Sequence, residues 1–114
     1  MFALKLARAQ GLKVILSSSS DEKLMEVCKR FPQPPILTVN YAKTPDWHSE
    51  VLKHTDGVGV DIVLENGGPG TILKSLQCTR RGGIVSQVGY LDRAKFDDAL
   101  ELIPTLIDRR INWR

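Results

Sequence analysis

The chain has few of the features that place a protein in a membrane or outside the cell. No apolar run among its 114 residues approaches the roughly 20 residues of a membrane-spanning helix, and no secretory signal opens it. The two cysteines, Cys28 and Cys78, lie fifty positions apart and have the spacing of neither a disulfide framework nor a metal site. We therefore expect a cytoplasmic protein with reduced thiols, no membrane contact and no zinc.

An excess of charge of one sign is also missing. Sixteen Lys and Arg stand against thirteen Asp and Glu, and the two kinds are interspersed. The densest basic cluster is Arg109, Arg110 and Arg114, which is shorter than the basic stripe typical of nucleic-acid binding. With 42% hydrophobic and 25% charged residues, the composition is that of one globular domain over residues 1–114 that does not bind nucleic acid.

Apolar segments of helical and strand type alternate along the chain. The periodicity predicts helices over residues 1–10, 21–30, 44–55 and 71–79, and a short helix that starts at Pro104. It predicts buried strands over residues 13–17, 36–39, 60–64 and 84–88, and a further strand from Ile111. A polar stretch covers residues 92–98. Helices and strands in alternation, with short connections, predict an α/β fold in which helices flank a parallel sheet.

The first expected helix has an apolar face but no start signal. Phe2, Leu6 and Ala9 share one side of the helical wheel, which predicts that this side is buried. Gly11 stands where the end of a helix favours a left-handed residue. No Ser, Thr, Asp or Asn precedes the helix, so we expect that the chain starts inside a longer element.

Two further local signals define element boundaries. Ser19 and Glu22 have the spacing of a capping box at the start of the helix over residues 21–30. Arg81, Gly82 and Gly83 predict a turn before the strand over residues 84–88.

Small, polar and glycine residues follow the predicted strands. These residues are Ser17–Ser20, Asn40 and Tyr41, Glu65–Gly68, and Gly89 and Tyr90. In open parallel sheets, ligands bind beyond the carboxyl ends of the strands. Glycine lets a ligand approach the backbone closely, so this edge is the predicted binding edge.

The end of the first strand carries information about the ligand. Folds that bind NAD usually place a carboxylate at the end of their second strand for the ribose hydroxyls, and in this chain Ser18 stands at about that place. A carboxylate repels a 2′-phosphate, but a hydroxyl can donate to one. Lys23 adds a cation one helical turn on, and Tyr41 adds a phenol after the next strand. The three residues together predict NADP rather than NAD. The competing interpretation is a surface lysine, a strand-end aromatic and a serine run that caps a helix.

Five segments resemble the cofactor domain of the medium-chain dehydrogenase/reductase superfamily. The match is to its alcohol dehydrogenase-like and quinone reductase-like members. Similar in order and spacing are residues 7–24, the pair VNY at 39–41 and TPDW at 44–47, GVGVDIVLE at 57–65, and residues 67–71 and 81–85. The resemblance covers nearly the whole chain.

The resemblance implies a Rossmann fold and NADP-dependent hydride transfer. By position, Ser18, Lys23 and Tyr41 would meet the adenosine 2′-phosphate. Asn66 and Gly67 would lie near the nicotinamide-side ribose, although Asn66 departs from the apolar residue usual there. The residues that would line the nicotinamide are Val88, Gly89 and Tyr90.

The family's first strand, its glycine loop and its catalytic domain have no counterpart in the sequence. We therefore expect an incomplete Rossmann fold that lacks the central strand. The two strands that this strand would join lose their shared partner, which costs several kcal/mol against a typical stability of about 5–15 kcal/mol. The chain alone is expected to be marginally stable, rearranged or prone to association. Such association includes the formation of homo-oligomers.

The sequence offers no nucleophile paired with a base. His48 and His54 lack neighbouring metal ligands, and Asp46, Glu50 and Glu65 are expected to be surface charges or caps. We therefore name no catalytic residue, and a small-molecule substrate is expected only for a complete enzyme.

Three functions remain open. The first is the NADP-binding portion of an alcohol dehydrogenase-like oxidoreductase, inactive alone. The second is a non-catalytic α/β module that binds nucleotides or pairs with another subunit. The third is a flavodoxin-like binding domain, against which the placement of Ser18 and Tyr41 argues.

Overall fold

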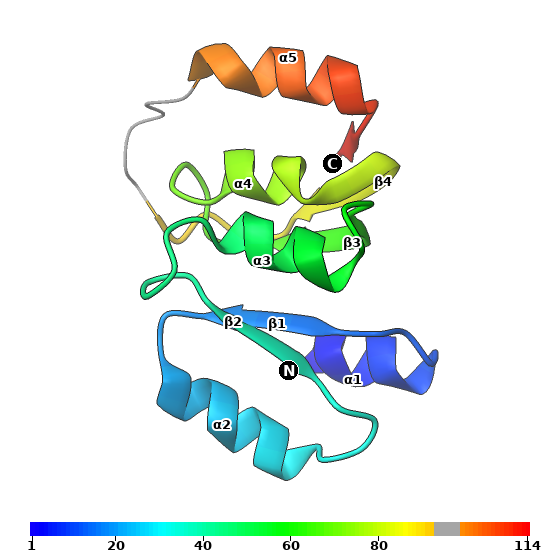
Figure 1. Ribbon diagram of the computed structural model, residues 1–114, viewed down its shortest axis with the longest axis vertical. Helices are drawn as coiled ribbons and strands as arrows, with labels where there is room; N and C mark the ends of the chain where they lie inside the picture. The colour runs from blue at the N-terminus through cyan, green and yellow to red at the C-terminus, as the bar shows by residue number, and fades with distance from the viewer. Residues whose placement is uncertain (93–98) are drawn as a thin grey trace. The chain divides into compact units, whose positions relative to one another are not determined.

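The computed structural model describes residues 1–92 and 99–114, without the side chain of Ala99 (Figure 1). The chain divides into two compact units, Met1–Trp47 and His48–Arg114. Every pair of neighbouring strands in the described residues is parallel. The predicted α/β class with parallel strands and flanking helices is therefore confirmed.

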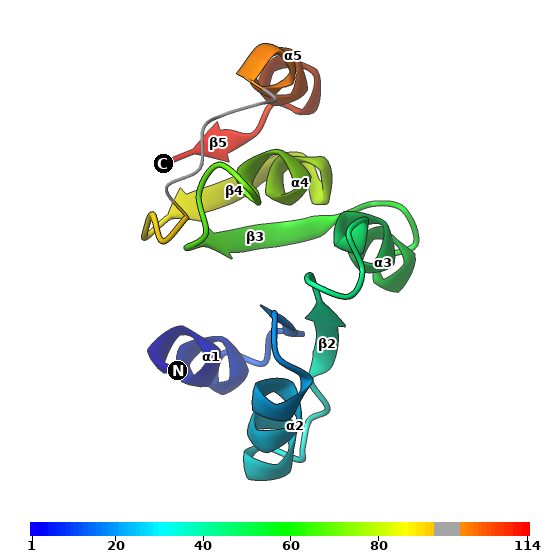
Figure 2. The ribbon, with the colours of Figure 1, turned by 90° about the vertical axis from the view of Figure 1, so that its left-hand side faces the viewer.

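The first unit contains two helices and a two-stranded sheet (Figure 2). Its elements are α1 (Phe2–Ala9), β1 (Ile15–Ser18), α2 (Asp21–Arg30) and β2 (Leu37–Asn40). The register of β1 and β2 runs from Ile15 opposite Leu37 to Ser18 opposite Asn40. Both strands lie slightly further along the chain than the apolar runs predicted, so each ends on a polar residue.

The buried side of α1 differs from the prediction. Leu4 is buried, whereas Phe2 is 80% exposed and Leu6 is 53% exposed. The guanidinium of Arg8, one helical turn after Leu4, donates to the carbonyl oxygens of Pro34 and Gln33. These hydrogen bonds turn the side that carries Leu4 and Arg8 toward residues 33–34, and apolar periodicity alone does not contain that information.

The ends of the two helices follow local signals, with one correction. Gly11 has the predicted left-handed conformation, with φ +72°. Helix α2 has the predicted bounds and buries Leu24, but its N-cap is Ser20 rather than Ser19. The Ser20 hydroxyl oxygen accepts from the backbone N–H of Lys23 at 3.3 Å. Because β1 continues to Ser18, the first helical turn begins one residue later than the capping-box spacing predicts.

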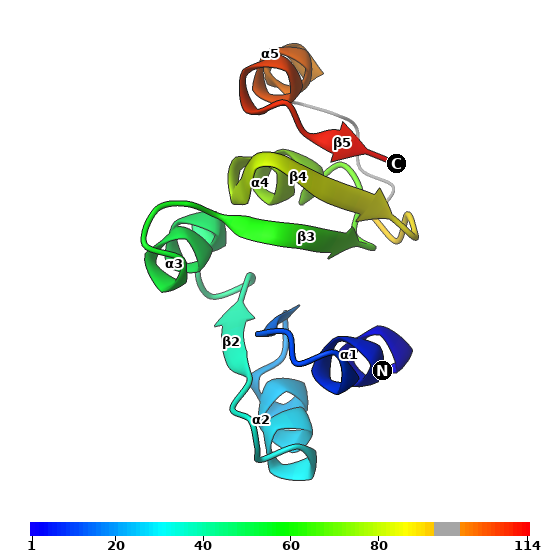
Figure 3. The ribbon, with the colours of Figure 1, turned by 90° about the vertical axis from the view of Figure 1, so that its right-hand side faces the viewer.

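The second unit contains a three-stranded sheet in the order β3-β4-β5, with all strands running in the same direction (Figure 3). Its strands are β3 (Val60–Glu65), β4 (Thr79–Gln87) and β5 (Asn112–Trp113), and its helices are α4 (Ile72–Gln77) and α5 (Ala99–Arg109). Helix α3 (Trp47–His54) crosses the boundary between the two units.

The core of the second unit lies between its helices and sheet. It is formed by the side chains of Ile72, Leu73 and Leu76 from α4, Val85 from β4 and Leu102 from α5. The predicted inward face of α4 is therefore confirmed. Complete burial of a Leu or Ile side chain contributes roughly 1.5–3 kcal/mol to the free energy of unfolding, so the burial of this cluster stabilises the unit.

Two predicted boundaries in the second unit are wrong. The expected turn at residues 81–83 lies inside β4, where the pairing passes from Val60 opposite Thr79 to Ile62 opposite Ile84. The additional residues of β4 form a bulge there, with Gly82 at φ +73°. Pro104 lies inside α5 instead of at its start. The predicted polar stretch at residues 92–98 lies, beyond Asp92, outside the described residues.

The two sheets have no strand in common. Strand β1 pairs only with β2 among the described residues, and β3 pairs only with β4. The resemblance to the dehydrogenase/reductase superfamily implies this pattern, which is that of a Rossmann sheet of order 3-2-1-4-5-6 without its central strand. Each of these strands therefore has one edge whose backbone N–H and C=O groups lack a neighbouring strand among the described residues.

We predict that the isolated 114-residue chain unfolds with low cooperativity or associates, because these edges lack strand partners. Calorimetry and sedimentation velocity over a concentration series test this. A concentration-dependent mass or a broad, weak transition is expected. A single sharp transition from a monomer would contradict the prediction.

Candidate functional site

The carboxyl ends of β1 and β2 bring Ser18 and Tyr41 together. Ser18 ends β1 directly opposite Asn40, and the backbone N–H of Tyr41 donates to the Ser18 carbonyl at 3.2 Å. The Ser18 hydroxyl oxygen accepts from the Ser20 N–H at 3.2 Å. Since the Ser18 hydroxyl is the acceptor in this bond, its own proton can be donated to a ligand.

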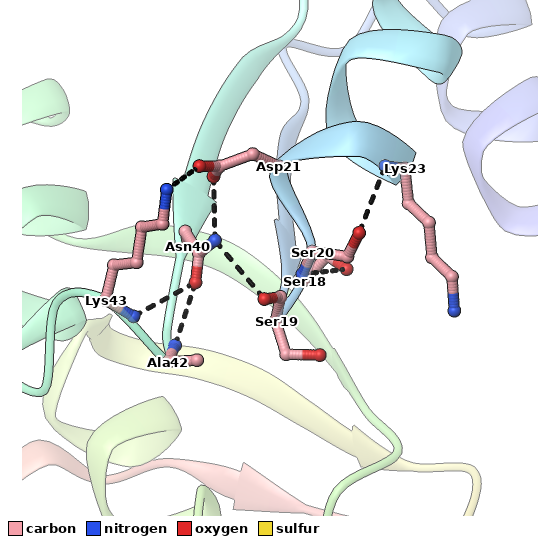
Figure 4. Close-up of polar contacts among 8 residues, drawn as sticks. All are labelled: Ser18, Ser19, Ser20, Asp21, Lys23, Asn40, Ala42 and Lys43. Carbon is pink, nitrogen blue, oxygen red and sulfur yellow. Dashed lines mark hydrogen bonds and ion pairs between the residues drawn. The ribbon is translucent and has the colours of Figure 1, made fainter.

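Lys23 lies in the first turn of α2, just beyond the same strand end. Only its backbone N–H takes part in the cap on Ser20. Its side chain extends away from the groups around Asn40 (Figure 4). The structure thus places Ser18, Lys23 and Tyr41 at one end of the first unit, and Tyr41 is 39% exposed.

Asn40 organises this strand end, a role that the sequence interpretation missed. Its Nδ2 donates to Asp21 Oδ1 at 2.7 Å and to the carbonyl of Ser19 at 3.3 Å. Its Oδ1 accepts from the backbone N–H groups of Ala42 at 3.0 Å and Lys43 at 3.1 Å. An Asn at the end of a strand, directly before a turn, is the sequence signal for this arrangement.

Asp21 and Lys43 form an ion pair beside Asn40. The hydrogen bond from Lys43, and after it the one from Asn40, lowers the pKa of Asp21 below its ordinary value. The Asp21 carboxylate is therefore ionised at neutral pH, and a permanent negative charge lies near the end of β1.

Glu65 ends β3 and is buried, with 4% of its surface exposed. Its Oε1 accepts from the N–H groups of Gly67 at 2.7 Å and Gly68 at 3.2 Å, and from the Thr71 hydroxyl at 2.6 Å. Its Oε2 accepts from the Ser75 hydroxyl. The expectation of a surface charge is therefore wrong, and the carboxylate acts as a cap. It fixes the turn at Gly67 and Gly68 and the start of α4 with four hydrogen bonds.

The loops that follow β3 and β4 are hydrogen-bonded to each other. Val88 N–H donates to the Glu65 carbonyl at 2.9 Å, and Leu91 N–H to that of Asn66 at 3.1 Å. A third bond joins Asp92 N–H to the Gly67 carbonyl at 2.7 Å. These contacts bring together the predicted residues of the second unit, which are Asn66, Gly67, Val88, Gly89 and Tyr90.

Close packing explains the glycine at position 89. A Cβ there would lie 1.7 Å from Oδ1 of Asn66, so any other residue requires Asn66 to move. Val88 is 64% exposed and Tyr90 is 53% exposed, so their side chains are open to a ligand.

The described residues form no metal site, and the Cys78 thiol among them is not reactive. Within residues 1–92 and 99–114, no three His, Cys, Asp or Glu side chains converge to hold a metal ion. Burial raises the pKa of the Cys78 thiol to about 12, which keeps it protonated and inert as a nucleophile. None of the helices in the same ranges is both long and apolar enough to cross a bilayer.

We predict that Glu65→Ala frees the backbone N–H groups of Gly67 and Gly68. Loss of about 3 kcal/mol of local stability would accelerate their hydrogen exchange roughly a hundredfold, as measured by NMR. Glu65→Gln keeps one acceptor oxygen and should have a smaller effect. Glu101→Ala, at an exposed position of α5, is the control. Unchanged exchange at both glycines in Glu65→Ala would show that the carboxylate does not hold this loop.

Comparison with known proteins relates these features to one family. The sequence profile described as "Zinc-binding dehydrogenase" matches residues 1–113. A zinc-type alcohol dehydrogenase-like protein of Schizosaccharomyces pombe is 39% identical over 114 residues, which cover 99% of this chain and 32% of that protein. The NADP-dependent isopropanol dehydrogenase of Clostridium beijerinckii is 30% identical over 108 residues, or 94% of this chain and 27% of that enzyme.

A solved structure agrees with the sequence relatives. The crystal structure of an NAD-dependent alcohol dehydrogenase has a TM-score of 0.79 at 26% identity, over 97% of this chain and 30% of that one. The chain thus spans about a third or less of the length of these relatives. The profile match over residues 1–113 and the shared fold together show that this chain belongs to the zinc-binding dehydrogenase family.

Proposed function

We propose that this chain is the NADP-binding portion of an alcohol dehydrogenase-like oxidoreductase. The complete protein would transfer hydride between NADPH and a carbonyl, an alcohol, or a quinone or activated alkene. The observation that carries the proposal is the end of β1, where a serine hydroxyl stands in the place of the carboxylate that usually binds the ribose of NAD. The named relatives include both an NADP-dependent and an NAD-dependent enzyme, so the residues themselves must supply the argument for NADP.

The residues of the first unit fit the adenosine half of the cofactor. Ser18 offers a hydroxyl, Lys23 an ammonium and Tyr41 a phenol, all at one strand end. The Lys23 ammonium has no hydrogen-bond or ion-pair partner within residues 1–92 and 99–114. Donors and a free cation suit a phosphate dianion better than a pair of ribose hydroxyls.

The residues of the second unit fit the nicotinamide half. Asn66 and Gly67 would face the nicotinamide-side ribose, and Val88, Gly89 and Tyr90 would line the ring. Hydrogen bonds between the two loops already fix their backbones, so little order would have to be gained on binding. The amide of Asn66 can hydrogen-bond a ribose hydroxyl, which an apolar residue at this position could not.

The bound cofactor would supply the hydride, and the side chains described above would bind and orient it. We assign no catalytic residue to this chain. Zinc does not fit the described residues, because no donor set converges among them. The metal, if the complete protein uses one, would be bound by other residues.

The alternative is a non-catalytic module that pairs with another subunit. The observation that favours it is the unpartnered edge of β1 and of β3 among the described residues. Titration of the chain with NADPH separates the two functions, because the cofactor-binding portion should bind NADPH saturably even though it transfers no hydride alone, whereas a module that only pairs with another subunit would not bind it.

We predict that the chain binds NADPH more tightly than NADH, and that Lys23→Ala removes this preference. Loss of one charge-assisted hydrogen bond should weaken NADPH about tenfold and change NADH less than twofold, as measured by calorimetric titration. Lys29→Ala, exposed in the last turn of the same helix, is the matched control. An equal affinity for both cofactors in the unmodified chain would contradict the assignment of NADP.

A further inference from the structure

The carboxylate of Asp21 lies close to the proposed phosphate end of the site. Asp21 is the first residue of α2 and follows Ser18 by three positions. Asn40, directly opposite Ser18 in the sheet, holds Asp21 Oδ1 at 2.7 Å. Like charges repel, so the Asp21 carboxylate would oppose the binding of a 2′-phosphate near this strand end.

Lys43 compensates this charge from the loop that follows β2. Its ammonium pairs with Asp21 Oδ2, and its backbone N–H donates to Asn40 Oδ1 at 3.1 Å. Lys43 is therefore attached to the strand end both by its backbone and by its side chain. Figure 4 shows Asp21, Asn40 and Lys43 gathered on one side of the strand end, with Lys23 extending away from them.

The ion pair is exposed and can exchange its partner. The side chains of Lys43 and Asp21 are 71% and 46% exposed, respectively. Exposed pairs of this kind contribute only about 0–1 kcal/mol, so a second anion can compete for the ammonium. A phosphate dianion carries more charge than a carboxylate, and the Lys43 side chain has the reach of four methylenes.

We propose that Lys43 and Asp21 together set the preference between phosphorylated and unphosphorylated dinucleotide. Lys43 cancels the charge of Asp21 in the free protein and turns its ammonium toward the 2′-phosphate when NADPH binds. Asp21 keeps the cation at the strand end and weakens NADPH binding by competing for it. This inference rests on the proposed binding of dinucleotide at the end of β1.

The test is a set of calorimetric titrations of the 114-residue chain with NADPH and with NADH. Lys43→Ala leaves Asp21 uncompensated, so it should weaken NADPH about tenfold and change NADH less than twofold. Asp21→Asn frees Lys43 and should strengthen NADPH about threefold. The double variant should lie between the two, and Lys43→Arg should keep the preference for NADPH.

Lys53→Ala is the matched control. Lys53 pairs with Glu50 at 2.9 Å, and their side chains are 72% and 42% exposed, so the variant breaks an exposed pair of the same kind that belongs to the second unit. The control should leave the ratio of the two affinities unchanged. Circular dichroism and sedimentation velocity of each variant, compared with the unmodified chain, establish that its secondary structure and state of association are unchanged.

Three results would overturn the inference, and the first two of them separate it from the proposed function. Equal weakening of both cofactors by Lys43→Ala would mean that Lys43 only shapes the loop. If Lys43→Ala leaves the ratio of the NADPH and NADH affinities unchanged, as Lys53→Ala should, then Lys43 has no role in the preference between the two cofactors. In both cases binding of NADPH by the unmodified chain would leave the proposed function intact. If the unmodified chain binds neither cofactor, the proposed function fails and the inference fails with it.

Discussion

The backbone N–H groups that follow a strand need hydrogen-bond acceptors, and the two proposed half-sites depend on how this need is met. In each unit, one polar side chain at a strand end supplies them. Oδ1 of Asn40 accepts from the N–H groups of Ala42 and Lys43, and Oε1 of Glu65 accepts from those of Gly67 and Gly68. Without these acceptors, the loops that carry the candidate binding residues would have no defined course.

The two acceptors work in different surroundings, and this gives the loops different properties. Glu65 is buried, so its charge is tolerated only because four donors surround the carboxylate. The loop that it holds is therefore fixed. Asn40 is neutral and half-exposed, and the charges beside it, on Asp21 and Lys43, are screened by water. This strand end can change its ion pairing without a large cost, which suits the recognition of a charged group.

The sequence predicts those parts of the fold that depend on neighbours along the chain. The alternation of helices and parallel strands follows from apolar periodicity, and the end of α1 follows from the backbone freedom of Gly11. The choice of Ser20 over Ser19 as N-cap depends on the length of β1, which only the pairing with β2 determines. Pro104 lies inside α5, although proline locally favours the first turn of a helix. Leu102 of the same helix is buried in the core of the second unit, a contact with residues distant in the sequence.

The candidate site is predictable to a similar extent. Strand-end position brought Ser18, Tyr41 and Gly89 into consideration, because parallel strands present their carboxyl ends at one edge. The role of Asn40 was missed, because one of its bonds reaches a segment 21 residues away. For Glu65 a cap was among the expected roles, but its burial was missed, because the sequence does not show it.

The central claim is that the strand-end loops of the first unit bind the 2′-phosphate end of NADPH. The most direct measurement is a titration of the ¹⁵N-labelled chain with NADPH, followed by the shifts of its backbone amide signals in NMR. The account predicts saturable shifts in residues 18–23 and 40–43 of the first unit, and it also predicts shifts in residues 66–70 and 88–91 at the strand ends of the second. No saturable shift in residues 18–23 and 40–43, or shifts spread over residues away from the strand ends, would contradict it.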